Sequence, residues 1–243
     1  LSRARTKLNL DFDATLSEHW KSKLELKGFF DGLYFLRSDN HYTDDMRDTY
    51  QDEFEAKEVY VLGSYDAFDI KIGRQSVVWG KSDNIRITDV INPLDNREPG
   101  MIDIEDLRLP VGMSKFDYYQ DNWNISAMLV HEYRIQKEAA FGSDFLPTHI
   151  FPLPQGKAFP AEIFPESDLA KPQYALAFNL QFSGGDIAFY HANVLDSRWH
   201  LKRDFSARKY DLIHMSGVAA NKVVGSWLIK SEVAHFSDLI YSG

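Results

Sequence analysis

The chain has 243 residues, of which 44% are hydrophobic and 14% aromatic, and its formal net charge at pH 7 is -9. An acidic chain without a clustered basic surface cannot neutralise phosphates, so we expect no nucleic-acid partner. No apolar run approaches the roughly 18–20 residues that a helix needs to cross a bilayer, which excludes a helical membrane protein. Cysteine is absent, and with it disulfides and thiolate metal sites.

The first segment of the chain alternates strictly between apolar and polar residues. Every even-numbered residue from 8 to 16 is Leu, Phe or Ala, and every odd-numbered residue from 9 to 17 is Asn, Asp, Thr or Ser. Successive side chains of a strand point to opposite sides, so this pattern predicts a strand with one polar face.

The same alternation recurs along the chain and predicts about ten strands. We place them at residues 6–17, 23–36, 54–65, 67–78, 113–121, 123–133, 173–183, 186–195, 209–219 and 222–235. The connections between them alternate in length, and the long ones cover residues 37–53, 79–112, 134–172 and 196–208. Short turns on one side and long loops on the other are typical of outer-membrane barrels.

The predicted fold is therefore all-β, an antiparallel transmembrane β-barrel of the outer-membrane type that forms a single domain over residues 1–243. A soluble β-sandwich also alternates polar and apolar residues and is the alternative fold. If the short turns are periplasmic, an earlier strand should precede residues 6–17, and residues 239–243 give no closing strand. We therefore expect an incomplete part of a larger barrel, truncated at both ends.

Several motifs in the first half resemble a known protein family. They are Ile72–Lys81, Thr88–Asp95 and Asp103–Pro110, within a stretch of roughly 3–133. The family is known mainly as a domain of unknown function. Its members look like large outer-membrane barrels of Gram-negative bacteria, are often encoded near RND-type exporters and are suspected of transport. The resemblance implies a place in the outer membrane, contact with the lipid bilayer, and an RND-type export system or other envelope proteins as partners.

The long, charged loop 79–112 carries much of this resemblance and could fold into the lumen as a constriction. Its charged side chains, with one from the preceding strand, would line the path of the solute: Arg74, Lys81, Arg86, Asp89, Asp95, Arg97, Asp106 and Arg108. The alternative is a loop held by its own hydrogen bonds, with turns at Asn92-Pro93 and Pro99-Gly100.

Charged residues on the polar faces of the strands would line the lumen and tune which solutes pass. They are Asp11, Asp13, Glu25, Lys27, Asp69, Lys71, Lys230 and Glu232. In a soluble sandwich the same residues would only cover the surface.

Two further loops carry weaker signals. Loop 134–172 holds six of the nine prolines, and its phenylalanines could receive an apolar solute or pack against neighbouring loops. Its phenylalanines are Phe141, Phe145, Phe151, Phe159 and Phe164. The aspartates between residues 39 and 52 could bind calcium, but they lack the spacing of an EF-hand and fit a solvated face better.

Catalytic motifs are missing from the sequence. It has no Gly-x-Ser-x-Gly turn, no phosphate-binding loop and no His-Glu-x-x-His pair, so we expect neither an enzyme nor a cofactor. Asp186 with His191, or His131 with Glu132, could form an acid–base pair, but no spacing rule supports either.

The expected function is that of a porin-like or transporter barrel, which moves a solute of apolar or lipid-like character across the outer membrane. The alternatives are a soluble β-sandwich that binds a ligand or partner, and a barrel sheath that encloses a partner subunit.

Overall fold

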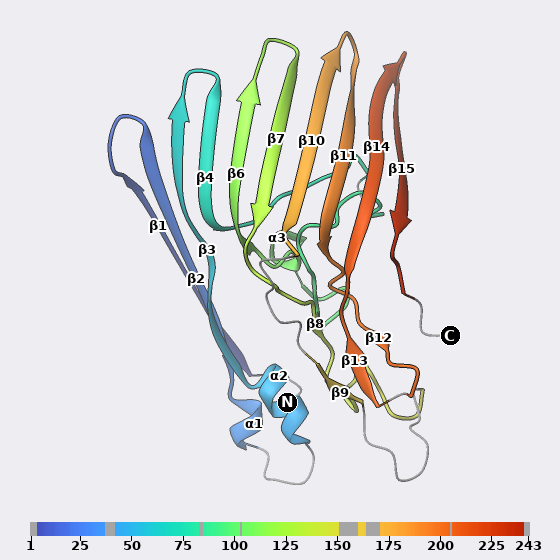
Figure 1. Ribbon diagram of the computed structural model, residues 1–243. Coiled ribbons are helices and arrows are strands. Elements are labelled where there is room, and N and C mark those ends of the chain that lie inside the picture. The colour runs from blue at the N-terminus through green and yellow to red at the C-terminus, as the bar shows by residue number, and fades with distance from the viewer. Residues whose placement is uncertain are drawn as a thin grey trace.

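The computed structural model describes residues 4–36, 42–82, 85–102, 104–150, 160–163, 171–204 and 206–240. Ten long strands form one continuous sheet in the order β1-β2-β3-β4-β6-β7-β10-β11-β14-β15, and every neighbouring pair is antiparallel (Figure 1). The bounds are β1 (Arg5–Thr15), β2 (Trp20–Asp31), β3 (Asp52–Tyr65), β4 (Phe68–Gln75), β6 (Val111–Tyr119), β7 (Trp123–Val130), β10 (Gln173–Phe182), β11 (Gly185–Leu195), β14 (Leu212–Val224) and β15 (Trp227–Ser237).

The remaining elements are short. A parallel pair joins β5 (Asp95–Asn96) to β8 (Lys137–Glu138), and a three-stranded sheet joins β12 (His200–Leu201), β13 (Ala207–Lys209) and β9 (Ala161–Glu162). The helices are α1 (Leu33–Leu36), α2 (Asp44–Tyr50) and α3 (Ile104–Leu107). Within the described residues, no helix combines the length and the apolar character that a membrane span requires.

The hairpin turns all lie at one end of the sheet, and the described parts of the long connections leave the strands at the other end, where α1 and α2 lie (Figure 1). Because β1 runs towards the turns and β15 runs away from them, the first strand begins and the last strand ends at the loop side. The predicted asymmetry between short turns and long loops is therefore present in the structure.

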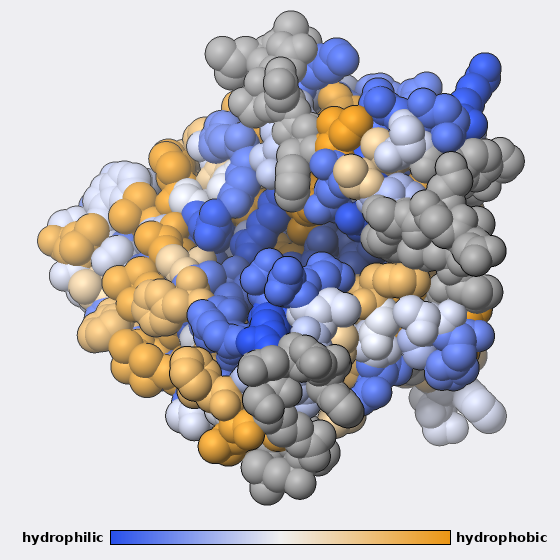
Figure 2. All heavy atoms as spheres, turned by 90° about the horizontal axis from the view of Figure 1, so that it is seen from below, coloured by the Kyte–Doolittle hydropathy of each residue, from blue (hydrophilic) through white to orange (hydrophobic). Residues whose placement is uncertain are grey.

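The two faces of the sheet differ in character. We call the outer face the one that carries Leu10, Leu129 and Leu176; its side chains are mainly large and apolar, and many of them are exposed. Exposed apolar side chains of this face include Leu8, Leu10, Phe12, Phe30, Phe54, Val59, Ile72, Phe116, Ile125, Leu129, Leu176, Phe189, Val218 and Val233. The opposite, inner face surrounds a hollow lined mainly by hydrophilic residues (Figure 2).

The chain between β4 and β6, residues 76–110, crosses the inner face, and we call it the crossing segment. Near its start Trp79 stacks on Tyr190 of β11, with ring centroids 4.7 Å apart. Further along, a Cβ on Gly217 of β14 would lie 2.7 Å from the methyl group of Thr88. The segment therefore leaves β4, reaches the far strands and returns to β6.

Small residues on the inner face make room for the crossing segment. The buried core contains Val77, Trp79 and Ile91 of the segment, packed with inner-face residues of the strands. Those of β10, β11 and β14 are largely alanine: Ala175, Ala177, Ala188, Ala192 and Ala219. Because an alanine side chain is small, the irregular crossing segment can pack closely against the backbone of these strands.

Asn92 ties the two ends of the crossing segment together. Its side-chain oxygen accepts a hydrogen bond from the Val77 backbone at 2.8 Å, and its side-chain nitrogen donates to the carbonyl oxygen of Leu109 at 2.9 Å. The same nitrogen lies 3.4 Å from the carbonyl oxygen of Gln75. Asn92 is only 3% exposed, so water cannot replace its side chain as the hydrogen-bond partner of these backbone groups.

The structure corrects three sequence-based expectations. The sheet is open, because β1 and β15 do not pair with each other among the described residues. The predicted strand 23–36 ends at Asp31, whose side chain accepts a hydrogen bond from the Leu33 backbone as the chain turns into α1. The last turn lies at Gly225 and residue 226, not at Ala220 and Asn221, because the positive φ of Gly225 permits the reversal there.

Candidate functional site

A carboxylate with two arginines lies at the centre of the crossing segment. The side chain of Asp89 is almost fully buried, and one of its oxygens accepts hydrogen bonds from Arg86 at 2.9 Å and from Arg108 at 2.9 and 2.7 Å. Arg86 also donates to the carbonyl oxygens of Asp89 and Asn92. All three charged side chains belong to the segment, so this cluster stabilises the fold of the segment itself.

A second cluster joins the crossing segment to β3. Arg97 donates to both oxygens of Asp95, at 2.9 and 2.6 Å, and to Glu53 at 2.7 Å. Burial by itself raises the pKa of Asp95, but the hydrogen bonds and charge of Arg97 outweigh it, so the pKa lies below its ordinary value. Burial opposes the charge on Arg97 as well, yet Asp95 and Glu53 raise its pKa.

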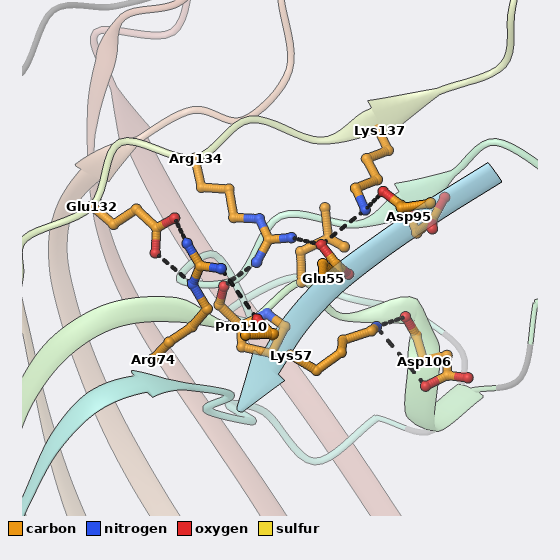
Figure 3. A network of polar contacts seen from close by, with 12 residues as sticks. Glu55, Lys57, Arg74, Asp95, Asp106, Pro110, Glu132, Arg134 and Lys137 are labelled. Atoms are coloured by element: carbon orange, nitrogen blue, oxygen red, sulfur yellow. Dashed lines mark hydrogen bonds and ion pairs between the residues drawn. The ribbon is translucent and has the colours of Figure 1, made fainter. Parts of the chain in front are cut away.

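The cluster continues across the loop end of the inner face (Figure 3). Arg134 donates to Glu55 at 2.7 Å and to the carbonyl oxygen of Pro110 at 2.6 Å. Lys137 pairs with Glu55 at 3.1 Å and also with Glu53. The two glutamates of β3 therefore hold cations from the crossing segment and from the chain that follows β7.

Arg74 and Lys57 make further polar contacts of this network, which Figure 3 also shows. Arg74 binds both oxygens of Glu132, at 3.1 and 2.5 Å, at the exit from β4. Lys57 donates to the backbone carbonyl oxygen of Asp106 at 3.0 Å, and Lys27 binds the carboxylate of the same aspartate. Arg74, Asp95, Arg97 and Asp106 are thus engaged with groups of the wall or of their own segment.

The far side of the crossing segment is attached to the last strands of the sheet. Lys81 binds Asp186 of β11 at 2.5 Å. Glu232 of β15 accepts hydrogen bonds from the backbones of Lys81 and Ser82 and from Thr88. With these contacts, each of the eight predicted constriction residues is hydrogen-bonded or ion-paired within the chain.

The predicted lumen-lining residues share the inner face. Asp11 lies opposite Glu25, Asp69 lies opposite Asp117, and Lys230 lies opposite Asn221 on neighbouring strands. The others at inner positions of their strands are Asp13, Lys27, Lys71 and Glu232. The alternation in the sequence therefore assigned these residues to one side of the sheet.

A cleft of about 120 Å³ opens between β1–β3 and the crossing segment. Its lining mixes aromatic rings with charges of both signs, and the guanidinium of Arg5 lies 4.3 Å from the ring centre of Phe29. Its charged lining residues are Arg5, Lys7, Lys27, Lys57, Arg97, Glu53, Glu55, Asp95, Glu98 and Asp106. Five cations face five anions, so the cleft suits a neutral or zwitterionic group better than an ion.

Sequence reasoning did not assign six members of the network to it, which are Glu53, Glu55, Lys57, Glu132, Arg134 and Lys137; it named Glu132 only as a possible acid–base partner of His131. Glu53, Glu55 and Lys57 stand two residues apart in β3, so the alternation already placed them on one face. Glu132, Arg134 and Lys137 follow the end of β7, and nothing in the sequence indicates their partners.

The weaker site expectations have mixed outcomes. Asp186 and His191 occupy opposite faces of β11, so they do not form an acid–base pair, while Glu132 binds Arg74. Asp45 accepts a hydrogen bond from the Phe141 backbone at 2.9 Å. In the described part of the chain, no three or more His, Cys, Asp or Glu side chains are grouped so that they could hold a metal ion. Of the phenylalanines in loop 134–172, those at 151, 159 and 164 lie outside the described residues.

Comparison with known proteins places the chain in a family. The family model described as "Protein of unknown function (DUF1302)" matches residues 1–241, so the chain belongs to this family. The match extends well beyond residues 3–133, the stretch that contains the motifs resembling this family. No curated protein matches the chain.

Proposed function

We propose that this chain forms a wall of an outer-membrane β-barrel in a Gram-negative bacterium and that a solute crosses the membrane along its inner face. The observation that carries the proposal is the contrast between the two faces of one sheet. The outer face is a broad surface of exposed Leu, Phe, Ile and Val, and the inner face carries the charges. A sheet in lipid needs an apolar exterior, whereas a solute path needs polar walls.

The dimensions of the strands fit this role. The ten long strands contain 8 to 14 residues, and a tilted strand needs about 9–11 residues to cross a bilayer. Unpaired backbone groups in hydrocarbon cost several kcal/mol each. The proposal therefore requires further strands to pair with β1 and β15 in the membrane.

The crossing segment supplies the constriction of the proposed path. It lies on the inner face, and its position is fixed by the clusters around Asp89, Arg97 and Glu232. Since the eight predicted constriction residues are all hydrogen-bonded or ion-paired within the chain, selectivity would depend more on the shape of the remaining opening and on balanced charges than on a net field. This favours solutes without net charge, including apolar or lipid-like molecules.

A pair of substitutions on β10 tests the proposal. Leu176→Arg places a cation on the outer face, where lipid contact should cost about 2–4 kcal/mol at mid-bilayer and reduce insertion into vesicles. Asn179→Arg places the same side chain on the inner face, so insertion should be unchanged while conductance in planar bilayers shifts.

Each alternative predicts a different result. A soluble binding protein would remain dispersed without detergent and tolerate Leu176→Arg. A sheath around another subunit would insert normally, show no conductance and copurify with that subunit. Copurification of an RND-type export system with a conducting barrel would identify the expected partner.

A further inference from the structure

Two cavities meet at the loop end of the inner face. The first is the cleft of about 120 Å³ between β1–β3 and the crossing segment. The second, which we call the loop chamber, has a volume of about 300 Å³ and lies between α2, the crossing segment and the chain that follows β7. Thr49, Glu53 and Arg97 line both cavities. These three residues therefore form a shared wall between the loop chamber and the cleft.

Arg97 holds the shared wall in place. Its guanidinium donates to both oxygens of Asp95, to Glu53 at 2.7 Å and to the carbonyl oxygen of Thr49 at 3.2 Å. The side chain of Arg97 is only 13% exposed. Glu53 is bound by Lys137 as well. The shared wall thus contains charges of both signs, and each of these charges has a partner.

The two cavities lie in series from the loop end to the interior. Asp45 and Phe141 line the loop chamber at the loop end of the sheet. Lys7 and Asn9 line the cleft, are exposed, and occupy inner positions of β1. Figure 2 views this end of the molecule and shows hydrophilic residues around the hollow. A solute that enters at the loop end can therefore reach the inner face of β1 through both cavities.

The paired charges of the shared wall select against ions. An anion that binds Arg97 would compete with Asp95 and Glu53 and leave a carboxylate without its partner in a mostly buried place. A cation that binds Glu53 would displace Arg97 or Lys137 in the same way. A wholly apolar solute would remove water from these groups without replacing its hydrogen bonds. Hydroxyl and amide groups both donate and accept hydrogen bonds, so they can contact the wall while its ion pairs stay intact.

We propose that the loop chamber and the cleft form one binding passage for small uncharged solutes that carry hydroxyl or amide groups, and that the Arg97–Glu53 ion pair sets this charge preference. The inference rests on the proposed solute path, of which the passage is the narrow part. A solute hydroxyl donates to the carboxylate of Glu53 in the shared wall, and further along the cleft a solute oxygen accepts from the amide of Asn9.

A matched series of solutes tests the charge preference. Sorbitol, the anion gluconate and the cation N-methylglucamine are six-carbon polyols of similar size, and their fluxes from protein-containing vesicles can be measured separately. Sorbitol should pass fastest through the unmodified protein. Glu53→Gln should raise the flux ratio of gluconate to N-methylglucamine about fivefold, the factor that one unit charge at about 4 Å produces in water. Arg97→Gln should lower the same ratio by a similar factor.

Glu18→Gln is the matched control for these variants. It makes the same exchange in the exposed turn between β1 and β2, away from both cavities, and should leave the ratio unchanged. If Glu18→Gln shifts the ratio as much as Glu53→Gln does, the net charge of the protein sets the preference and the role of the shared wall is overturned. If Arg97→Gln does not fold, Glu53→Gln carries the test.

A single thiol tests the passage independently of transport. The chain has no cysteine, so Thr49→Cys places the only thiol of the protein in the shared wall. In detergent, sorbitol should slow the reaction of this thiol with N-ethylmaleimide severalfold, and gluconate should not. Thr15→Cys, at the exposed turn end of β1, is the control, and its reaction should be the same with and without sorbitol. In vesicles, modification of Thr49→Cys should reduce sorbitol flux, whereas modification of Thr15→Cys should not.

The two proposals fail in different ways. If sorbitol crosses the vesicle membrane but modified Thr49→Cys carries it as fast as before, the solute path exists and does not run through the shared wall. If no solute crosses while sorbitol still protects the Thr49→Cys thiol in detergent, the binding passage stands and the proposed transport is wrong. Absence of protection in detergent would overturn the binding passage itself.

Discussion

Asn92 offers a direct test of how the crossing segment is held. Asn92→Ala would remove the acceptor for the Val77 backbone and the donor for the Leu109 carbonyl, both in a buried place. A buried polar group left without its partner costs about 1–3 kcal/mol. With two such groups and a third, longer contact to Gln75, we expect the free energy of unfolding to fall by about 2–4 kcal/mol.

The measurement is urea unfolding in detergent micelles, followed by tryptophan fluorescence, with Trp79 in the affected core as a reporter. Asn96→Ala is the matched control, since Asn96 is only partly buried and makes one 3.4 Å hydrogen bond to Gln136. The control should lose less than about 1 kcal/mol. Similar losses in both variants, or a loss below about 0.5 kcal/mol for Asn92→Ala, would refute the role assigned to Asn92.

Three other predictions concern the glycines at 73 and 100, Asp95 and Trp79. Gly73→Ala should block folding, because φ at this position is +130° and the added Cβ would overlap the carbonyl oxygen of Val59. Gly100→Ala is the control: its φ is also positive, but the added Cβ meets open space, so the free energy of unfolding should fall by only about 1 kcal/mol. The folding yield in detergent compares the two variants. Asp95→Asn should destabilise the protein at neutral pH, because a carboxyl group with a lowered pKa contributes stability that is lost as pH falls through that pKa. Unfolding measured at a series of pH values should therefore show that the difference in stability between the variant and the unmodified protein shrinks in acid. Trp79→Ala should cost about 3–5 kcal/mol in the same urea experiment because it empties the stacking site on Tyr190; a loss under 1 kcal/mol would mean that Trp79 is no anchor.

The strands were predictable because their signal is local. Alternation over a few residues assigned each strand and, with few exceptions, its two faces. The exceptions arise where a side-chain hydrogen bond or a glycine, rather than the alternation, determines where a strand ends. Asp31 hydrogen-bonds to the backbone of the following turn and ends β2, and Gly225 allows a turn later than Ala220 and Asn221.

The path of the crossing segment was predictable only in part. Its length and charge suggested that residues 79–112 enter the interior, but the partners of its charges come from distant strands, as with Glu232 and Lys81. The sequence contains one further signal, which lies in the small residues of the strands. Ala175, Ala177, Ala188, Ala192 and Ala219 occupy inner positions where an open, water-filled wall would more often carry polar side chains, and this indicates that something packs against them.

Closure of the sheet could not be read from alternation at all. The pattern specifies which side of a strand is apolar, but it does not specify which strand pairs with an edge. The same limit applies to β1 and β15. Their sequence pattern is that of the other strands, although neither has a second neighbouring strand among the described residues.

The even number of strands has a practical consequence for topology experiments. If the sheet spans a membrane as proposed, a tag or protease site next to β1 or next to β15 reports the same side, because β1 starts and β15 finishes at the loop side. A probe in a hairpin turn, such as the one at Gly225, reports the opposite side. Three labels, one beside each edge strand and one in that turn, would therefore orient the whole sheet relative to the cell.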